Sequence, residues 1–336
     1  MKRQLVHTYQ DIISQENLLA AWQEFLKGKR RKHDVQLFGF NLLENIVQLH
    51  DDLTNKTYRH GGYHDFYITD PKLRHIHKAS VRDRLVHRAI YRVLCPFFDR
   101  IFSVDSYSCR INKGVHKAIN RFRTFGWQVS KNNTKTCWVL KCDIRKFFDS
   151  IDHRVLMSIL NSYIPDKDIL WLLKIVIDSF SSGRLGVGLP LGNLTSQLFV
   201  NVYMNVFDQF VKHKLKSVHY VRYADDFVLL SDNRGSLERQ LVLNREFLDR
   251  RLRLALHPNK ISIRTLASGV DYLGWVQFSN HRVLRTKTKQ RMFRKIMDAN
   301  FSNNGLQSYL GLFSHGNTWK LRQQLLDSFW IRYHRC

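Results

Sequence analysis

The sequence is poor in proline, in acidic residues and in paired cysteines. Its 336 residues include 5 prolines and 5 cysteines, and 28 Asp and Glu stand against 54 Lys and Arg. The odd number of cysteines and the lack of any C-x-x-C pair argue against a disulfide framework and against a structural zinc site. We expect these cysteines to be reduced and mostly buried: Cys95, Cys109, Cys137, Cys142 and Cys336.

Long apolar runs are also missing. The most apolar stretch, 171–177, is short and contains Lys174, and no apolar signal core follows the charges of Met1-Lys-Arg3. We therefore expect no membrane contact and a cytoplasmic protein. What is abundant is positive charge, since the formal net charge of +26 makes a polyanion, nucleic acid first, the expected partner.

The apolar pattern predicts an α+β fold, with an antiparallel sheet covered on one face by helices. The final 61 residues, 276–336, carry eleven Lys and Arg against two acids on a helical pattern. The predicted helices cover 10–50 (broken by the basic run 27–32), 81–98 (ended by Cys95-Pro96), 152–160, 166–180, 194–210 and 236–254. The predicted strands and hairpins cover 63–76, 137–144, 218–231, 261–263 and 272–278, with a glycine-rich loop at 183–192.

Acidic residues gather at two predicted strand ends, which is notable in so basic a chain. Asp143 ends one strand, and Asp225 and Asp226 lie at the turn of a hairpin. If the strands are neighbours, the carboxylates converge and repel one another unless a hard cation such as Mg²⁺ lies between them. Two such ions, about 3.5–4 Å apart, would support nucleotidyl transfer. The alternative is that Asp-Asp only makes a hairpin turn.

Flanking motifs favour the catalytic interpretation. The motifs are Asp143 with Phe148, Leu189-Pro-Leu-Gly-Asn-Leu-Thr-Ser196, Tyr223-Ala-Asp-Asp226, Lys260, and Tyr272-Leu-Gly-Trp275. Together they resemble the reverse transcriptases. The resemblance covers about residues 60–280 and implies a right-hand polymerase fold. It divides the chain into a basic helical segment (1–60), fingers (61–136), a palm (137–275, with a fingers-type insertion at about 160–195) and a helical basic thumb (276–336).

The resemblance assigns roles to single residues. Asp143 and Asp225 would hold two Mg²⁺ ions, with Mn²⁺ as a substitute, and Asp226 would be a weaker ligand or an orienting group. Lys260 would act as general acid toward the leaving pyrophosphate. Phe148 would be the steric gate that excludes a ribose 2′-hydroxyl, so that the product is DNA. Its alternative role is that of an ordinary core phenylalanine.

The same family pattern gives residues for substrate and primer. Pro71-Lys-Leu-Arg-His75 resembles the fingers hairpin whose Lys72 and Arg74 grip the triphosphate, and we expect both side chains on one strand face. Tyr272, Leu273 and Gly274 would form the primer grip, although alone they read as a buried strand. The tail from Arg282 to Arg335 would follow the duplex backbone; a basic helical bundle without specific function is the alternative.

The loop before the 194–210 helix indicates the subclass. Most reverse transcriptases have Gln before the loop glycine and Pro after its serine, whereas this chain has Leu191 before Gly192 and Gln197 after Ser196. This form resembles the enzymes of diversity-generating retroelements, which are bacterial or phage-encoded. They copy a template RNA with errors at adenines and work with a small basic ring-forming accessory protein. Leu191 would relax nucleotide selection, or would only pack.

We therefore expect a minimal RNA-directed DNA polymerase whose partners are template RNA, a primer–cDNA duplex and deoxynucleoside triphosphates. At 336 residues the chain leaves no room after the thumb for an RNase H domain or an endonuclease. The alternatives are a retron-like or phage-defence reverse transcriptase, and a catalytically silent RNA-binding protein with a palm fold. A two-metal nuclease would need the clustered acids but neither the primer grip nor the aromatic gate.

Overall fold

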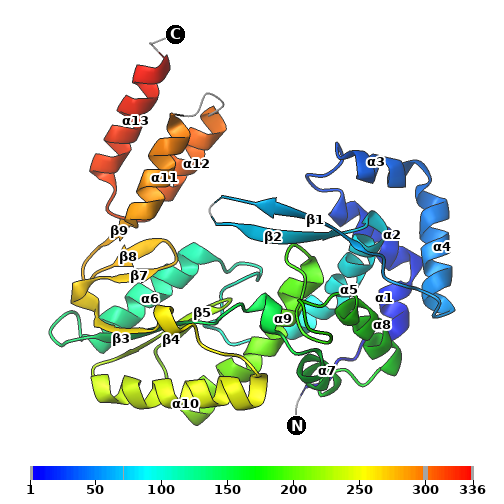
Figure 1. The fold of residues 1–336 in the computed structure, drawn as a ribbon, viewed down its shortest axis with the longest axis horizontal. Helices are drawn as coiled ribbons and strands as arrows, with labels where there is room; N and C mark the ends of the chain where they lie inside the picture. The colour runs from blue at the N-terminus through cyan, green and yellow to red at the C-terminus, as the bar shows by residue number, and fades with distance from the viewer. Residues whose placement is uncertain (1–2, 71, 298–301, 334–336) are drawn as a thin grey trace.

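The computed structural model describes residues 3–70, 72–297 and 302–333 (Figure 1). The predictions made for Pro71, Cys336 and Arg335 lie outside the described residues. Within them, no helix is both long and apolar enough to cross a membrane. The four described cysteines are free, and all but Cys109 are buried, as predicted.

The N-terminal region is helical, as its apolar period predicts. Its helices pack through residues such as Ile12, Leu18 and Trp22 against α5, and the basic run 27–32 lies in the turn between α2 and α3. The helices are α1 (Tyr9–Ile13), α2 (Gln15–Phe25), α3 (His33–Phe40), α4 (Leu42–Thr54) and α5 (Val81–Asp99).

Helix α5 continues through Pro96 to Asp99, so the prediction that Cys95-Pro96 ends it is wrong. A proline inside a helix removes one backbone hydrogen bond and strains the preceding turn. Beyond the proline, Phe98 is only 1% exposed and packs in the main core. We attribute the continuation of the helix to this packing.

An antiparallel hairpin precedes α5 and projects toward the C-terminal helices (Figure 1). Strands β1 (Tyr63–Ile68) and β2 (Arg74–Ala79) pair from Tyr63 opposite Ala79 to Ile68 opposite Arg74. The predicted hairpin is confirmed. Lys72, however, lies in the connection and not on a strand, so the expectation that it shares a strand face with Arg74 is wrong.

The central sheet has the strand order β4-β5-β3-β6, and every pair is antiparallel. Its strands are β3 (Trp138–Asp143), β4 (Tyr220–Tyr223), β5 (Asp226–Ser231) and β6 (Ser262–Thr265). Asp143, the last residue of β3, pairs with Asp226, the first residue of β5. The register of the sheet therefore places the two carboxylate-bearing strand ends side by side.

Helices cover both faces of this sheet, not one face as predicted. Leu140 and Cys142 join a core with α9 (Leu194–Gln209) and α10 (Arg234–Leu252), while Val139 joins a second core with α6 (Val115–Val129). Val139 and Leu140 are 1% and 0% exposed. In a sheet with one solvent-exposed face, apolar and polar residues alternate along each strand. Strand β3 lacks this alternation, which indicates already from the sequence that both faces of the sheet are covered.

Two short helices and a glycine-rich loop lie between β3 and α9. Helices α7 (His153–Asn161) and α8 (Lys167–Asp178) begin at Asp152 and Asp166, whose side chains accept hydrogen bonds from the first backbone amides. The loop 183–192 then leads into α9, as the glycine pattern predicts.

A second, three-stranded antiparallel sheet connects the central sheet to the C-terminal helices. Its strands are β7 (Val270–Tyr272), β8 (Trp275–Gln277) and β9 (Arg282–Leu284), followed by α11 (Thr286–Ile296), α12 (Asn303–Phe313) and α13 (Trp319–Tyr333). The single strand predicted over 272–278 is wrong, because Tyr272 pairs with Trp275 across a two-residue turn. The palm–thumb boundary expected at 275/276 falls inside β8.

Candidate active site

Three aspartates lie at the same end of two neighbouring strands. Asp143 and Asp226 face each other across the β3–β5 pair, and Asp225 occupies the turn between β4 and β5. The Ile144 amide donates to the Asp225 carbonyl at 3.2 Å, which holds the turn against the end of β3. The convergence predicted from the sequence therefore occurs.

Burial makes these carboxylates costly in their charged form. It raises the pKa of Asp226 to about 7, against the opposing charge of Lys141, and Asp143 and Asp225 raise this pKa further. Burial is also the main cause of the raised pKa of Asp225, followed by the charge of Asp143. In addition, Asp226 Oδ1 is buried without a hydrogen-bond partner among the described residues. A bound cation would stabilise all three ionised groups.

The residues fit a hard divalent cation by their chemistry. Their donors are carboxylate oxygens, which Mg²⁺ prefers, and one of them is the unpartnered Asp226 Oδ1. Within the described residues, no group of three or more His, Cys, Asp or Glu side chains is arranged to hold a metal. Instead, Lys260 Nζ donates to Asp143 Oδ1 at 2.8 Å, so an ammonium group neutralises that carboxylate.

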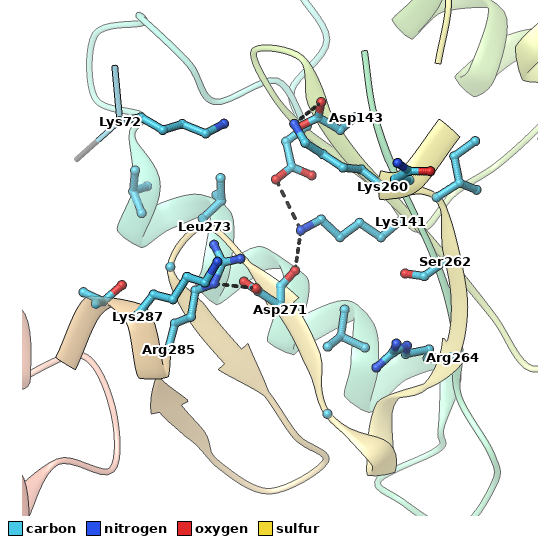
Figure 2. Close-up of a pocket in the computed structure, with 18 of the residues that line it drawn as sticks. Lys72, Lys141, Asp143, Lys260, Ser262, Arg264, Asp271, Leu273, Arg285 and Lys287 are labelled. Atoms are coloured by element: carbon cyan, nitrogen blue, oxygen red, sulfur yellow. Dashed lines mark hydrogen bonds and ion pairs between the residues drawn. The ribbon is translucent and has the colours of Figure 1, made fainter. Parts of the chain in front are cut away.

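A large basic cleft, of about 1030 Å³, opens beside Asp143 and Asp226 (Figure 2). Eight Lys and Arg line it against three aspartates, Asp143, Asp226 and Asp271. The cations come from several separate elements of the fold: Lys72, Arg74, Lys141, Lys260, Arg264, Arg285, Lys287 and Arg291. The walls of the cleft thus suit a polyanion, while its floor suits metal ions.

Across this cleft, the β1–β2 hairpin touches the C-terminal helices. Asp70, at the end of the hairpin, forms ion pairs with Arg291 and Lys295, which lie one turn apart on α11. Lys72 and Arg74 of the same hairpin line the cleft, where the sequence places a triphosphate grip.

Phe148 lies beside the site but not among the residues that line the cleft. It begins a short 3₁₀ turn five residues after Asp143 and is half-buried against Phe147, which is 4% exposed. Its carbonyl accepts a hydrogen bond from the Leu189 amide at 2.8 Å. This bond connects the proposed gate to the start of the Leu-Pro-Leu-Gly motif.

The Leu191–Gly192 segment packs against β2. The Leu191 carbonyl accepts from the His77 amide at 2.9 Å, and Gly192 has φ +105°. A Cβ on Gly192 would meet Ile76 Cγ2 at 2.8 Å, so glycine is required both for the backbone conformation and for the close approach. Gln197 follows in the first turn of α9 and, like Leu191, does not line the cleft.

The three proposed primer-grip residues divide between the cleft and the core. Leu273 and Gly274 line the cleft and form the β7–β8 turn, with φ values of 51° and 86°. Positive φ at both positions is typical of a two-residue hairpin turn. Tyr272 is instead fully buried, stacked on Phe122 at 5.5 Å, and burial raises its pKa well above the usual value.

Among the cleft residues that sequence reasoning missed are Lys141 and Asp271. Lys141 lies two positions before Asp143 and therefore points to the same face of β3, a spacing that is readable from the sequence. Its partner Asp271 comes from the second sheet, 130 positions later, and no local pattern indicates that contact.

The architecture is that of a right-hand polymerase. A solved telomerase from Candida albicans, in complex with a fragment of telomeric RNA, matches with a TM-score of 0.53 at 13% identity, over 81% of this chain and 54% of that chain. The sequence model of the family described as "Reverse transcriptase (RNA-dependent DNA polymerase)" matches residues 68–277. The chain belongs to this reverse transcriptase family.

Curated relatives include bacterial and intron-encoded proteins. Protein YkfC of Escherichia coli (strain K12) is 28% identical over 335 residues, which covers 85% of each chain. The group II intron-encoded protein LtrA of Lactococcus lactis subsp. cremoris is 25% identical over 177 residues, or 50% of this chain and 28% of LtrA. The chain thus spans less than a third of LtrA.

Proposed function

We propose that this protein is an RNA-directed DNA polymerase that copies a template RNA into cDNA. One observation carries the proposal: Asp143 and Asp226 meet at the paired ends of β3 and β5 on the floor of a cleft whose walls are basic, and Asp225 lies next to them in the β4–β5 turn. A polymerase needs both features, because metal ions must be held beside a polyanionic duplex. Membership of the reverse transcriptase family supports the same activity.

The family resemblance supplies the roles proposed for the acidic residues. Asp143 and Asp225 would hold two Mg²⁺ ions, and Asp226 would be a weaker ligand or an orienting group. Once bound, the ions would activate the primer 3′-hydroxyl and neutralise charge on the transferred phosphate. Lys260, whose ammonium group pairs with Asp143, would donate a proton to the leaving pyrophosphate.

The walls supply the contacts to the substrates. Lys72 and Arg74 would bind the triphosphate, Leu273 and Gly274 would support the primer end, and Phe148 would exclude ribonucleotides. In this proposal residues 61–136 act as fingers, residues 137–275 as palm and residues 276–336 as thumb, with the sheet β7-β8-β9 as the joint between the last two.

We further propose that the enzyme serves a diversity-generating retroelement and makes errors at template adenines. The support is the sequence Leu189-Pro-Leu-Gly-Asn-Leu-Thr-Ser-Gln197, with leucine where most reverse transcriptases have glutamine. A small basic ring-forming accessory protein belongs to this proposal. Since this chain is itself strongly basic, RNA is the natural bridge between the two proteins.

Primer extension tests the activity. The purified protein is given an RNA template with an annealed DNA primer, deoxynucleotides and Mg²⁺, and the product is sequenced. We expect cDNA that depends on Mg²⁺ and on the template, with misincorporation concentrated opposite adenine. RNA binding without any extension would instead support a catalytically silent RNA-binding protein. Extension without errors at adenine would contradict the assignment to a diversity-generating retroelement but would leave the polymerase activity in place.

A further inference from the structure

Lys141 lies between the aspartates of the active site and the β7–β8 hairpin. The proposed chemistry requires a fixed distance between these two parts of the cleft. Its side chain projects from β3, two residues before Asp143, and is 20% exposed. Figure 2 shows it reaching from the strand toward Asp271, with Asp143 and Lys260 on its other side. The proposed function gives this residue no role.

On the catalytic side, Lys141 is the cation beside Asp226. Lys141 Nζ lies 3.6 Å from Asp226 Oδ2, and the Asp226 side chain is 19% exposed. The other oxygen of this carboxylate has no hydrogen-bond partner within the part of the chain that the structure describes. Among the described residues, Lys141 is therefore the positive group that holds the orientation of the Asp226 side chain.

On the primer side, Lys141 is bound to the β7–β8 hairpin, whose turn consists of Leu273 and Gly274. Lys141 Nζ donates to the Asp271 backbone carbonyl at 2.5 Å, and Asp271 is the central residue of β7. The Asp271 carboxylate in turn pairs with Arg285 Nε at 2.8 Å. Because the Arg285 amide donates to the Gly274 carbonyl at 3.1 Å, the chain of contacts closes on the hairpin turn.

We propose that Lys141 is a positioning residue that fixes the distance between the primer-supporting hairpin β7–β8 and the aspartates of the active site. This inference rests on the proposed function. β7 belongs to a different sheet from β3 and β5, so the backbone ladders of the central sheet do not set this distance. A side-chain contact from β3 to the β7 backbone does.

The predicted consequence is an effect on the rate of chemistry more than on binding. A misplacement of about 1 Å between reacting groups can cost roughly 100-fold in rate. We expect Lys141→Met, which keeps the length of the side chain but loses the ammonium group, to lower kcat by about 10- to 100-fold. The KM for primer–template should change by less than about 3-fold, and Lys141→Arg should recover most of kcat.

Arg264→Met is the matched control. Arg264 lines the same cleft from β6, is exposed, and among the described residues has no ion pair with Asp226 or Asp271. Its replacement removes the same charge, so it should raise KM through weaker electrostatic attraction and leave kcat within about 2-fold. Equal losses of kcat in the two variants would overturn the proposal in favour of a general charge effect.

A second readout requires no metal and no turnover. A fluorescent base analogue at the primer 3′-end, bound in the presence of EDTA, reports how firmly the terminus is held. We expect a more mobile terminus with Lys141→Met and a wild-type signal with Arg264→Met; identical signals in all three proteins would overturn the proposal. If wild-type protein extends no primer, the proposed function fails, whereas the EDTA experiment still tests the linkage.

Thermal unfolding establishes that the variants are folded. Should Lys141→Met unfold, Arg285→Met tests the same connection from its other end, because it removes the support of the Asp271 carboxylate. We expect a mobile primer terminus there too, and a firmly held terminus would overturn the proposal.

Discussion

The floor and the walls of the cleft are built by opposite means. The floor aspartates lie on paired strand ends, and the side chains of Asp143 and Asp226 are 15% and 19% exposed. Wall cations such as Lys72, Arg285 and Lys287 lie outside the strands and are exposed. The floor thus depends on backbone register and carries a desolvation cost, whereas the walls depend on long side chains in water. A single substitution at the floor should therefore abolish activity, whereas each substitution of a wall cation should reduce nucleic-acid binding only in part.

The largest effect is expected at the floor. Asp225→Asn removes a metal-binding charge but keeps the shape of the side chain, so primer extension should fall by about 100-fold or more. RNA affinity, measured by filter binding, should stay within about 3-fold. Asp232→Asn, an exposed acid just past the other end of β5, is the control and should be active. Extension near the wild-type rate by the Asp225 variant would remove the metal site from this strand end.

Removing cations of α11, two of which line the cleft walls, should weaken binding. For the triple change of Lys287, Arg291 and Lys295 to alanine, we expect duplex affinity to drop roughly 10- to 100-fold at low salt. The slope of log affinity against log salt should flatten by up to about 0.9 for each phosphate that the variant no longer neutralises. Asp70→Asn, which frees two of these cations, should change affinity in the opposite direction. An unchanged slope would make α11 a solvated surface.

Phe148 is intermediate between the buried floor and the exposed walls, because it is half-buried beside the floor. Phe148→Ala should reduce the preference for deoxyribonucleotides by about 10-fold or more, since space opens for a 2′-hydroxyl. Competition between the two nucleotide types during primer extension measures this preference. Phe147→Leu, in the core next to it, controls for a general loss of packing. An unchanged preference with Phe148→Ala would make this ring an ordinary packing residue.

The smallest effect concerns Leu191, whose side chain does not line the cleft. One additional hydrogen bond is worth about 0.5–1.5 kcal/mol, so Leu191→Gln should lower misincorporation opposite adenine by roughly 2- to 10-fold. Sequencing of cDNA from a defined RNA gives the error spectrum. Leu185→Gln makes the same change at a position of the same loop that is 93% exposed, and should leave the spectrum as it was. Equal spectra in all three enzymes would assign the errors to other residues.

The floor could be predicted from the sequence because its signals are local. Asp143 ends an apolar run and Asp225 interrupts two β-rich runs, so strand pairing alone brings them together. The joint with the second sheet could not be predicted in this way. Tyr272 and Trp275 are both buried and read as one continuous strand, although Leu273 adopts the positive φ of a turn.

The contacts between distant segments are equally hidden in the sequence. The covering of both sheet faces depends on α6, whose apolar side meets β4 and β5, far further along the chain. From the sequence, Pro96 predicts a helix end because the cost of a proline inside a helix is local. The packing of Phe98, to which we attribute the continuation of the helix, depends on tertiary contacts that the sequence does not show. Lys141 does not stand out among 54 cations, since only the fold shows that it meets Asp226 and Asp271.

The ion pairs of Asp70 with Arg291 and Lys295 connect the β1–β2 hairpin to α11. All three side chains are partly exposed to solvent, so dissolved ions screen their attraction. A rise in ionic strength should therefore loosen the hairpin from α11 at the same time as it weakens the attraction of the cleft for a polyanion.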